Sequence, residues 1–115
     1  MKQKTIGLTY KNKKFKINLK VCNWIRKFIG LMFVRKEKAR ALLFEFKKNT
    51  KTAIHSYFVF FSFIAIWLDD KNKIIELKVV KSFTFLTHPK RPYFKLIEIP
   101  INNKYSKIVE LLVGD

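Results

Sequence analysis

Apolar and polar side chains alternate most regularly near the start of the chain, in residues 14–21. Phe15, Ile17, Leu19 and Val21 take one set of positions, and lysine and asparagine take the other. A period of two is typical of a strand with one buried face. Residues 4–9 read as a shorter strand, and residues 10–13 form a polar turn between the two. The pattern therefore predicts an N-terminal hairpin that carries lysines on its outer face.

The longest apolar stretch, residues 53–68, lies in the middle of the chain and is rich in aromatic and β-branched side chains. It is shorter than the about 20 residues that a helix needs to cross hydrocarbon, and His55 and Ser62 interrupt it. Aromatic and β-branched residues favour strands. We therefore expect a pair of buried strands broken near Ser62 rather than a membrane-spanning helix.

The remaining segments complete a mainly β pattern. Strands are expected at residues 41–46, 73–80 and 94–99, a loop at 47–51, and a turn at 69–72. Asn23 and Gly30 bound a predicted short helix near residues 23–30, and Asn102 or Asn103 begins another that ends near Gly114. The sequence thus predicts one domain, residues 1–115, folded as a small antiparallel β-sandwich or barrel with these two helices.

Charge is the most unusual feature of the composition. Twenty-five basic and eight acidic residues give a formal net charge of +17, and no acidic residue precedes Glu37. A surface of one sign attracts polyanions. The candidate polyanion-binding residues are the hairpin lysines, Lys11, Lys13, Lys14, Lys16 and Lys20. The alternative is a solvated outer face that also protects a sheet edge from pairing.

Motifs for catalysis and cofactor binding are missing. Three glycines are too few and too scattered for a phosphate loop or a dinucleotide fingerprint. Cys22, His55 and His88 lack the spacing of metal ligands. We therefore assign no catalytic residue, no metal ligand and no cofactor. His55, inside the apolar stretch, is interpreted either as a hydrogen-bonded core histidine or as the histidine of a small-ligand pocket.

Several short segments resemble, in order, the domain-of-unknown-function family 192, a family of small prokaryotic proteins. The segments are residues 30–33 (Gly-Leu-Met-Phe), 42–46, 54–58, 67–69 followed by 75–76, 94–100, and 113–115. The resemblance implies a compact, mostly antiparallel β-sandwich or barrel with short helices, and no known activity. Two positions depart from the family, which often has Arg where this chain has Ile29 and Asp where it has Ile64.

The first functional hypothesis is a non-catalytic binding or accessory domain. The second is nonspecific nucleic-acid binding through the basic N-terminal hairpin. The third is a small-ligand pocket or weak enzyme near His55, and the fourth is attachment to an anionic membrane surface. Because residues 1–10 lack the apolar core of a signal peptide, the expected location is the cytoplasm.

Overall fold

The computed structural model describes residues 2–22, 35–50, 59–83 and 89–114, with the side chains of residues 47–49 excepted. Six strands form one mixed sheet in the order β1-β2-β3-β6-β4-β5. The strands are β1 (Gln3–Tyr10), β2 (Lys13–Val21), β3 (Leu42–Thr50), β4 (Phe63–Leu68), β5 (Ile74–Val80) and β6 (Tyr93–Pro100). Two 3-10 turns, η1 (Lys36–Lys38) and η2 (Asn103–Tyr105), and a C-terminal helix, α2 (Ser106–Val113), complete the described elements.

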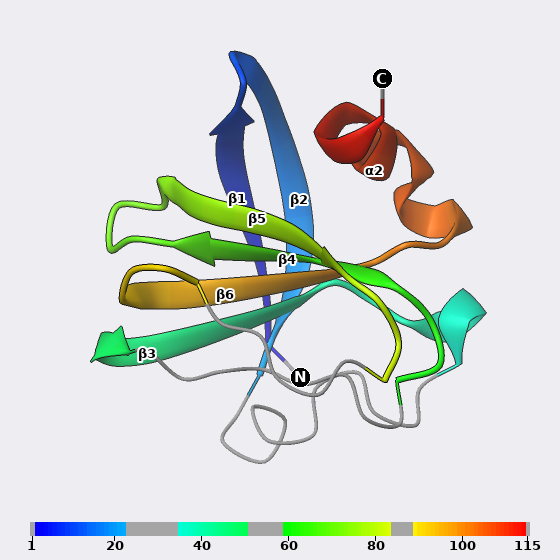
Figure 1. Cartoon of the computed structure of the whole chain (residues 1–115), viewed down its shortest axis with the longest axis horizontal. Helices are drawn as coiled ribbons and strands as arrows, with labels where there is room; N and C mark the ends of the chain where they lie inside the picture. The colour runs from blue at the N-terminus through cyan, green and yellow to red at the C-terminus, as the bar shows by residue number, and fades with distance from the viewer. Residues whose placement is uncertain (1, 23–34, 51–58, 84–88, 115) are drawn as a thin grey trace.

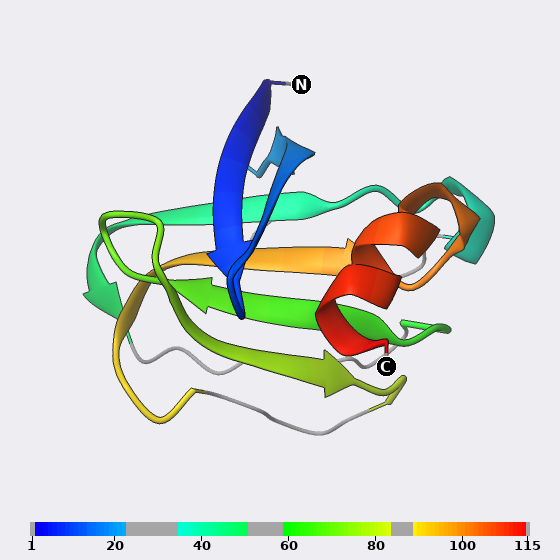
Figure 2. The ribbon, with the colours of Figure 1, turned by 90° about the horizontal axis from the view of Figure 1, so that it is seen from above.

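The sheet curls into an open half-barrel. Strands β3, β6, β4 and β5 form one layer, and the β1–β2 hairpin and α2 lie on the same side of it (Figures 1 and 2). A core of aliphatic side chains fills the space between them, including Ile6 and Leu19 of the hairpin, Ile66 and Ile97 of the layer, and Leu112 of α2. The mainly β prediction is confirmed.

The hairpin agrees closely with the alternation in the sequence. Strands β1 and β2 pair antiparallel from Gln3 opposite Lys20 to Tyr10 opposite Lys13. Ile17 and Leu19 are buried, while Lys14 and Lys16 are exposed. Lys11 and Asn12 have φ of 50° and 67°. Positive φ at both central positions is the geometry of a two-residue hairpin turn whose twist matches that of the strands.

One strand pair differs from the antiparallel expectation. Strand β2 runs parallel to β3 and pairs with it only at Lys20–Leu42 and Val21–Leu43. A parallel neighbour requires a long crossover, and the chain between Val21 and Leu42 supplies it. Alternation within a strand reveals its buried face but not the direction of its neighbour, so the sequence pattern alone could not show this pairing.

Two expected segments had different bounds. The polar run at 47–51 was predicted as a loop, but the backbone of β3 continues to Thr50, which pairs with Tyr93 after a register shift. Beyond Leu43 this strand has no described partner on its β2 side, so polar residues are tolerated there. In the apolar stretch, the second predicted strand is β4; residues 51–58 lie outside the described part, and residues 59–62 are not a strand. The predicted helix near residues 23–30 also lies outside it.

The opposite face of the layer carries a second, aromatic-rich core. It includes Phe44, Phe63, Trp67 and Tyr93, all buried. Trp67 and Tyr93 meet edge to face with ring centroids 6.4 Å apart. Strands β6 and β4, in the middle of the layer, are therefore covered by apolar contacts on both faces, which explains why β4 is a continuous apolar run rather than an alternating one.

Candidate anion-binding pocket

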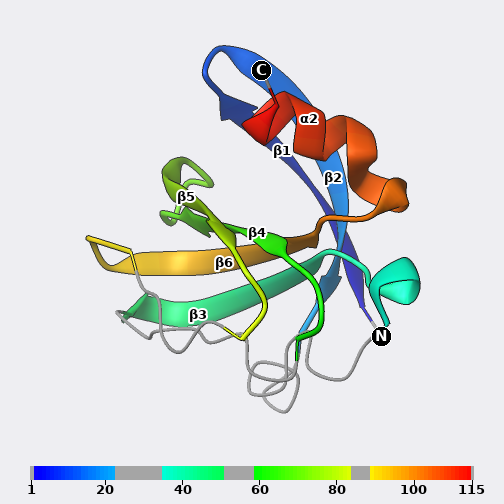
Figure 3. The ribbon, with the colours of Figure 1, turned by 45° about the vertical axis from the view of Figure 1, so that its right-hand side comes forward.

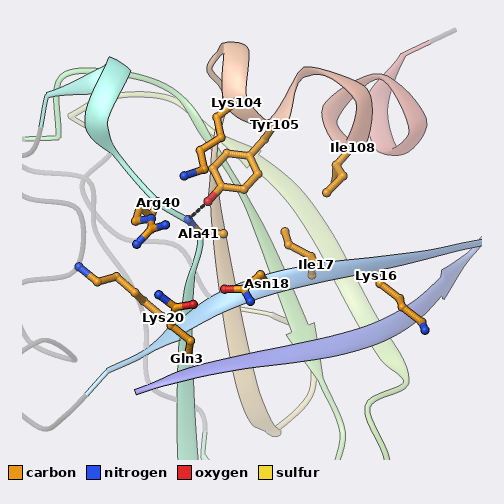
Figure 4. Close-up of a pocket in the computed structure, with 10 residues that line it drawn as sticks. All are labelled: Gln3, Lys16, Ile17, Asn18, Lys20, Arg40, Ala41, Lys104, Tyr105 and Ile108. Atoms are coloured by element: carbon orange, nitrogen blue, oxygen red, sulfur yellow. Dashed lines mark hydrogen bonds between the residues drawn. The ribbon is translucent and has the colours of Figure 1, made fainter. Parts of the chain in front are cut away.

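A pocket of about 390 Å³ opens between strand β2, the segment before β3, and the beginning of α2 (Figure 4). Parallel pairing with β3 covers only the last residues of β2, so the edge of this strand at residues 16–18 is left facing α2. The described residues that line the pocket are Gln3, Lys16, Ile17, Asn18, Lys20, Arg40, Ala41, Lys104, Tyr105 and Ile108.

Hydrogen bonds fix the wall formed by residues 36–41 against the start of the C-terminal helix. The hydroxyl of Tyr105 accepts the buried backbone N–H of Ala41 at 2.7 Å. The side-chain amide of Asn102 donates to the carbonyl oxygens of Lys36 and Ala39, at 2.8 and 3.1 Å. Its oxygen accepts the N–H of Tyr105 at 3.3 Å, which caps η2 as the sequence predicted for this position. The pocket therefore has a rigid wall built from residues far apart in the chain.

Four cationic side chains line this pocket: Lys16, Lys20, Arg40 and Lys104. In Figure 4, Lys20, Arg40 and Lys104 lie toward the end where Tyr105 meets Ala41, and Lys16 lies at the other end. No acidic side chain from the described residues lines the pocket. Unneutralised lysine and arginine side chains form strong charge-assisted hydrogen bonds to carboxylates and phosphates.

Neutral donors and an apolar floor complete the pocket. The Tyr105 hydroxyl accepts from Ala41, so its own proton is available to a ligand, and the amides of Gln3 and Asn18 can also donate. Ile17 and Ile108 supply apolar surface. This arrangement suits recognition of an anionic group attached to a partly apolar molecule.

The five hairpin lysines do not all lie at this pocket. Lys16 and Lys20 line the pocket described above. Lys14 shares another hollow, of about 410 Å³, with Lys16 on the hairpin itself. Lys11 lies at the hairpin tip, with its ammonium group 5.4 Å from the centre of the Tyr10 ring, and lines a third hollow beside β5. Lys13 is exposed and lines none of these three. Arg40 and Lys104 were not among the residues predicted from sequence.

The histidine hypothesis falls outside the described part of the chain, because residues 51–58 contain His55. Asp69 is a turn residue: its carboxylate accepts the N–H groups of Lys71 and Lys73 at 2.8 and 2.9 Å. These hydrogen bonds, led by the one from Lys73, lower the pKa of Asp69.

Within the described ranges, no group of three or more His, Cys, Asp or Glu side chains could hold a metal ion. No helix of the described residues is both long and apolar enough to cross a membrane.

A buried carboxyl group lies on the opposite face of the layer. Glu98 of β6 is 6% exposed and stands opposite Leu42 of β3 and Ala65 of β4. Burial raises its pKa to about 8, so it is mostly protonated at neutral pH. Burial also raises the pKa of Tyr93 to about 12, with a smaller contribution from Glu98. Glu98 and Glu45 do not form an acid pair, because Glu45 stands opposite Lys95 and binds the ammonium of Lys4 at 3.0 Å.

Two relatives of this chain carry names that state no activity. No family model matches the chain. It is 26% identical over 91 residues to the UPF0127 protein of Pyrococcus furiosus, covering 78% of each chain. It is 30% identical over 94 residues to the UPF0127 protein of Thermococcus kodakarensis, covering 80% of this chain but only 57% of that protein. The resemblance to an uncharacterised family is thus supported, although these relatives carry a different family name from the one expected.

Two solved structures share the fold. One, a candidate transcription regulator from Sinorhizobium meliloti, superposes with a TM-score of 0.74 at 11% identity and covers 92% of this chain and 84% of that one. The other, a protein of unknown function from Novosphingobium aromaticivorans, gives a TM-score of 0.71 at 12% identity, covering 89% and 75%. At this identity the likeness concerns the fold alone.

Proposed function

We propose that this chain is a non-catalytic binding domain, formed by residues 1–115, that holds an anionic ligand in the pocket between β2 and α2. The single observation that carries the proposal is that Lys20, Arg40 and Lys104 lie toward one end of a pocket and Lys16 at its other end, with no described acidic side chain in the lining. The cations come from β2, the segment before β3, and η2, so only the folded chain brings them together.

The chemistry of the pocket favours a phosphorylated small molecule. Arginine binds phosphate through two parallel hydrogen bonds, and lysine acts as a point charge beside it. A volume of about 390 Å³ lies within the range of small-ligand sites. The apolar surface of Ile17 and Ile108 would contact the uncharged part of such a ligand.

Isothermal titration with inorganic pyrophosphate and with a nucleoside monophosphate tests this proposal. The variants Arg40→Gln and Lys20→Gln should each weaken binding by about tenfold or more, since one charged hydrogen bond contributes about 1.5–3 kcal/mol. Lys107→Gln is the matched control, because Lys107 is an exposed lysine of α2 that does not line the pocket. Equal losses in all three variants would show that only net charge matters, and the proposal would then be abandoned.

Nonspecific nucleic-acid binding is the second candidate function. It is supported by Lys13, Lys14 and Lys16, which are exposed on the hairpin, and by the continuation of this surface through Lys16 into the pocket. Affinity for single-stranded DNA should then fall with salt, with a log–log slope of about −0.7 per phosphate neutralised. Replacing Lys14, Lys16 and Lys20 together by glutamine should flatten that slope by about 2. No retention of DNA at low salt would remove this candidate. The cytoplasmic location stays a prediction.

A further inference from the structure

A second hollow lies at the open side of the half-barrel, away from the pocket described above. Strands β1 and β5 are the two ends of the sheet order and approach each other without pairing (Figure 3). Between the hairpin tip and the start of β5 they border a groove of about 830 Å³. Its described lining residues are Gly7, Thr9, Tyr10, Lys11, Lys71, Asn72, Lys73, Ile74, Ile75, Glu76 and Leu77.

The groove follows the backbone edge of β5 rather than one face of it. Residues 73–77 line it without interruption, although neighbouring side chains of a strand point to opposite faces. Strand β5 pairs with β4 on one side, and no strand of the described residues pairs with its other side. Half of the N–H and C=O groups of an edge strand point outward, where they can bind an added strand. Across the groove, a Cβ atom at Gly7 would meet nothing within 4 Å, so space is open there.

The charge of the groove selects the kind of strand that fits it. Lys11, Lys71 and Lys73 line it. The one acidic lining residue, Glu76, is already engaged: its carboxylate accepts the N–H of Lys90 at 3.0 Å and the ammonium of Lys78 at 3.2 Å. The carboxylate of Asp69 accepts the backbone N–H groups of Lys71 and Lys73 and offsets part of their charge. The remaining positive charge, on a chain with net charge +17, disfavours a second copy of this chain and favours an acidic segment.

The floor of the groove is partly apolar. Tyr10, Ile74 and Leu77 are only partly buried and pack against the aliphatic core from this side. An added strand would place alternate side chains over this floor and toward the lysines. Five residues of strand edge extend about 16 Å, which is enough for a short recognition segment.

We propose that the free edge of β5 binds an extended acidic segment of a protein partner as an additional strand. This inference is independent of the ligand pocket, which lies between β2 and α2 and shares no lining residue with the groove. Backbone hydrogen bonds along Ile74–Leu77 would hold the segment, and Lys11, Lys71 and Lys73 would select its charge.

The test uses a capped seven-residue peptide in which glutamate alternates with valine, titrated into the full ¹⁵N-labelled chain. Binding should shift the amide signals of residues 74–77. A peptide of the same sequence with two backbone N–H groups methylated should bind at least tenfold more weakly, because it retains charge but loses donors. Lys71→Glu combined with Lys73→Glu should also cost at least tenfold, whereas Lys107→Glu, on exposed α2, should not.

Four results would overturn the inference. The methylated peptide could bind as tightly as the parent, which would leave only charge attraction. The peptide could instead shift signals around Lys20 and Arg40, which would place it in the ligand pocket. The chain could self-associate through β5, detected as a dimer by ultracentrifugation. Finally, the amide signals could stay unshifted at millimolar peptide. Strand addition would then be ruled out, and the lysines would be assigned to keeping this edge unpaired.

Discussion

Replacing Glu98 by glutamine should stabilise the protein, and the gain should grow with pH. Glutamine keeps the size and polarity of the side chain but cannot ionise. In the folded chain the Glu98 carboxyl has its pKa raised to about 8 by burial, against an ordinary value of 4.5. The unfolded chain releases this proton at lower pH than the folded chain does, so ionisation favours unfolding.

The magnitude follows from the distance between the two pKa values. Below pH 4.5 the carboxyl group is protonated in both states and costs nothing. Between pH 4.5 and 8 each pH unit removes about 1.4 kcal/mol from the free energy of unfolding. At pH 7 the loss is about 3–4 kcal/mol, and above pH 8 it levels off near 5 kcal/mol. These are large fractions of the stability of a domain of this size.

Urea unfolding at pH 5, 6, 7 and 8 measures the effect. The parent protein should lose stability steadily over this range, while Glu98→Gln should stay nearly constant, so the two curves meet near pH 4.5 and diverge above it. At pH 7 thermal unfolding should shift upward by about 10 °C in the variant. Glu110→Gln, on the exposed face of α2, is the control and should follow the parent. Parallel pH curves for the parent and Glu98→Gln would refute the reasoning.

Three further substitutions test other contacts. Tyr105→Phe leaves the buried N–H of Ala41 without its 2.7 Å acceptor and should cost about 1–3 kcal/mol in urea unfolding, with little change in the circular dichroism spectrum. Asn102→Ala removes the cap of η2 and two hydrogen bonds to residues 36–39, so it should lower the free energy of unfolding at least as much as Tyr105→Phe does. It should also weaken pyrophosphate binding, because these hydrogen bonds position Arg40. Unchanged stability would contradict this role. Asp69→Ala should destabilise the β4–β5 turn above pH 4, and the loss should shrink as the pH falls through the lowered pKa of Asp69, because a lowered pKa stabilises the fold only while the carboxylate is ionised. A loss that does not change with pH would argue against this role.

Local chemistry predicted the hairpin and the turns. The alternation of residues 14–21 is a one-dimensional signal, and the buried Ile17 and Leu19 follow from it directly. The Asp69 turn and the Asn102 cap depend on hydrogen bonds within four residues, so the residue types alone indicated them.

The pocket could be predicted only in part, because its walls come together through long-range contacts. Lys16 and Lys20 belonged to a visible pattern, whereas Arg40 and Lys104 are isolated in the sequence and reach the pocket through the Tyr105–Ala41 and Asn102–Lys36 hydrogen bonds. The hairpin lysines also line three different hollows, with Lys16 shared by two of them, and the alternation in the sequence does not show this division.

The sequence contains a weak indication that Glu98 is buried, which a count of charged residues does not show. The residue lies in the run Leu-Ile-Glu-Ile-Pro, between apolar neighbours on both sides. In an alternating strand a polar residue at this position would face solvent, but β6 is flanked by β3 and β4 and covered on both faces. Glu98 is buried because β6 lies inside the sheet, and a single sequence does not reveal the position of a strand in the sheet order.

The short parallel contact between β2 and β3 has a consequence for how the protein opens. Among the described residues, eight ladder pairs join β1 to β2, but only two ladder pairs join this hairpin to the rest of the sheet, across a crossover whose closure costs chain entropy. The hairpin can form early from neighbouring residues, while its docking must await the long connection. We therefore expect the amide protons of the β1–β2 hairpin and those of the remaining strands to exchange with deuterated solvent as two separate cooperative units. The short β2–β3 pairing between them should break first.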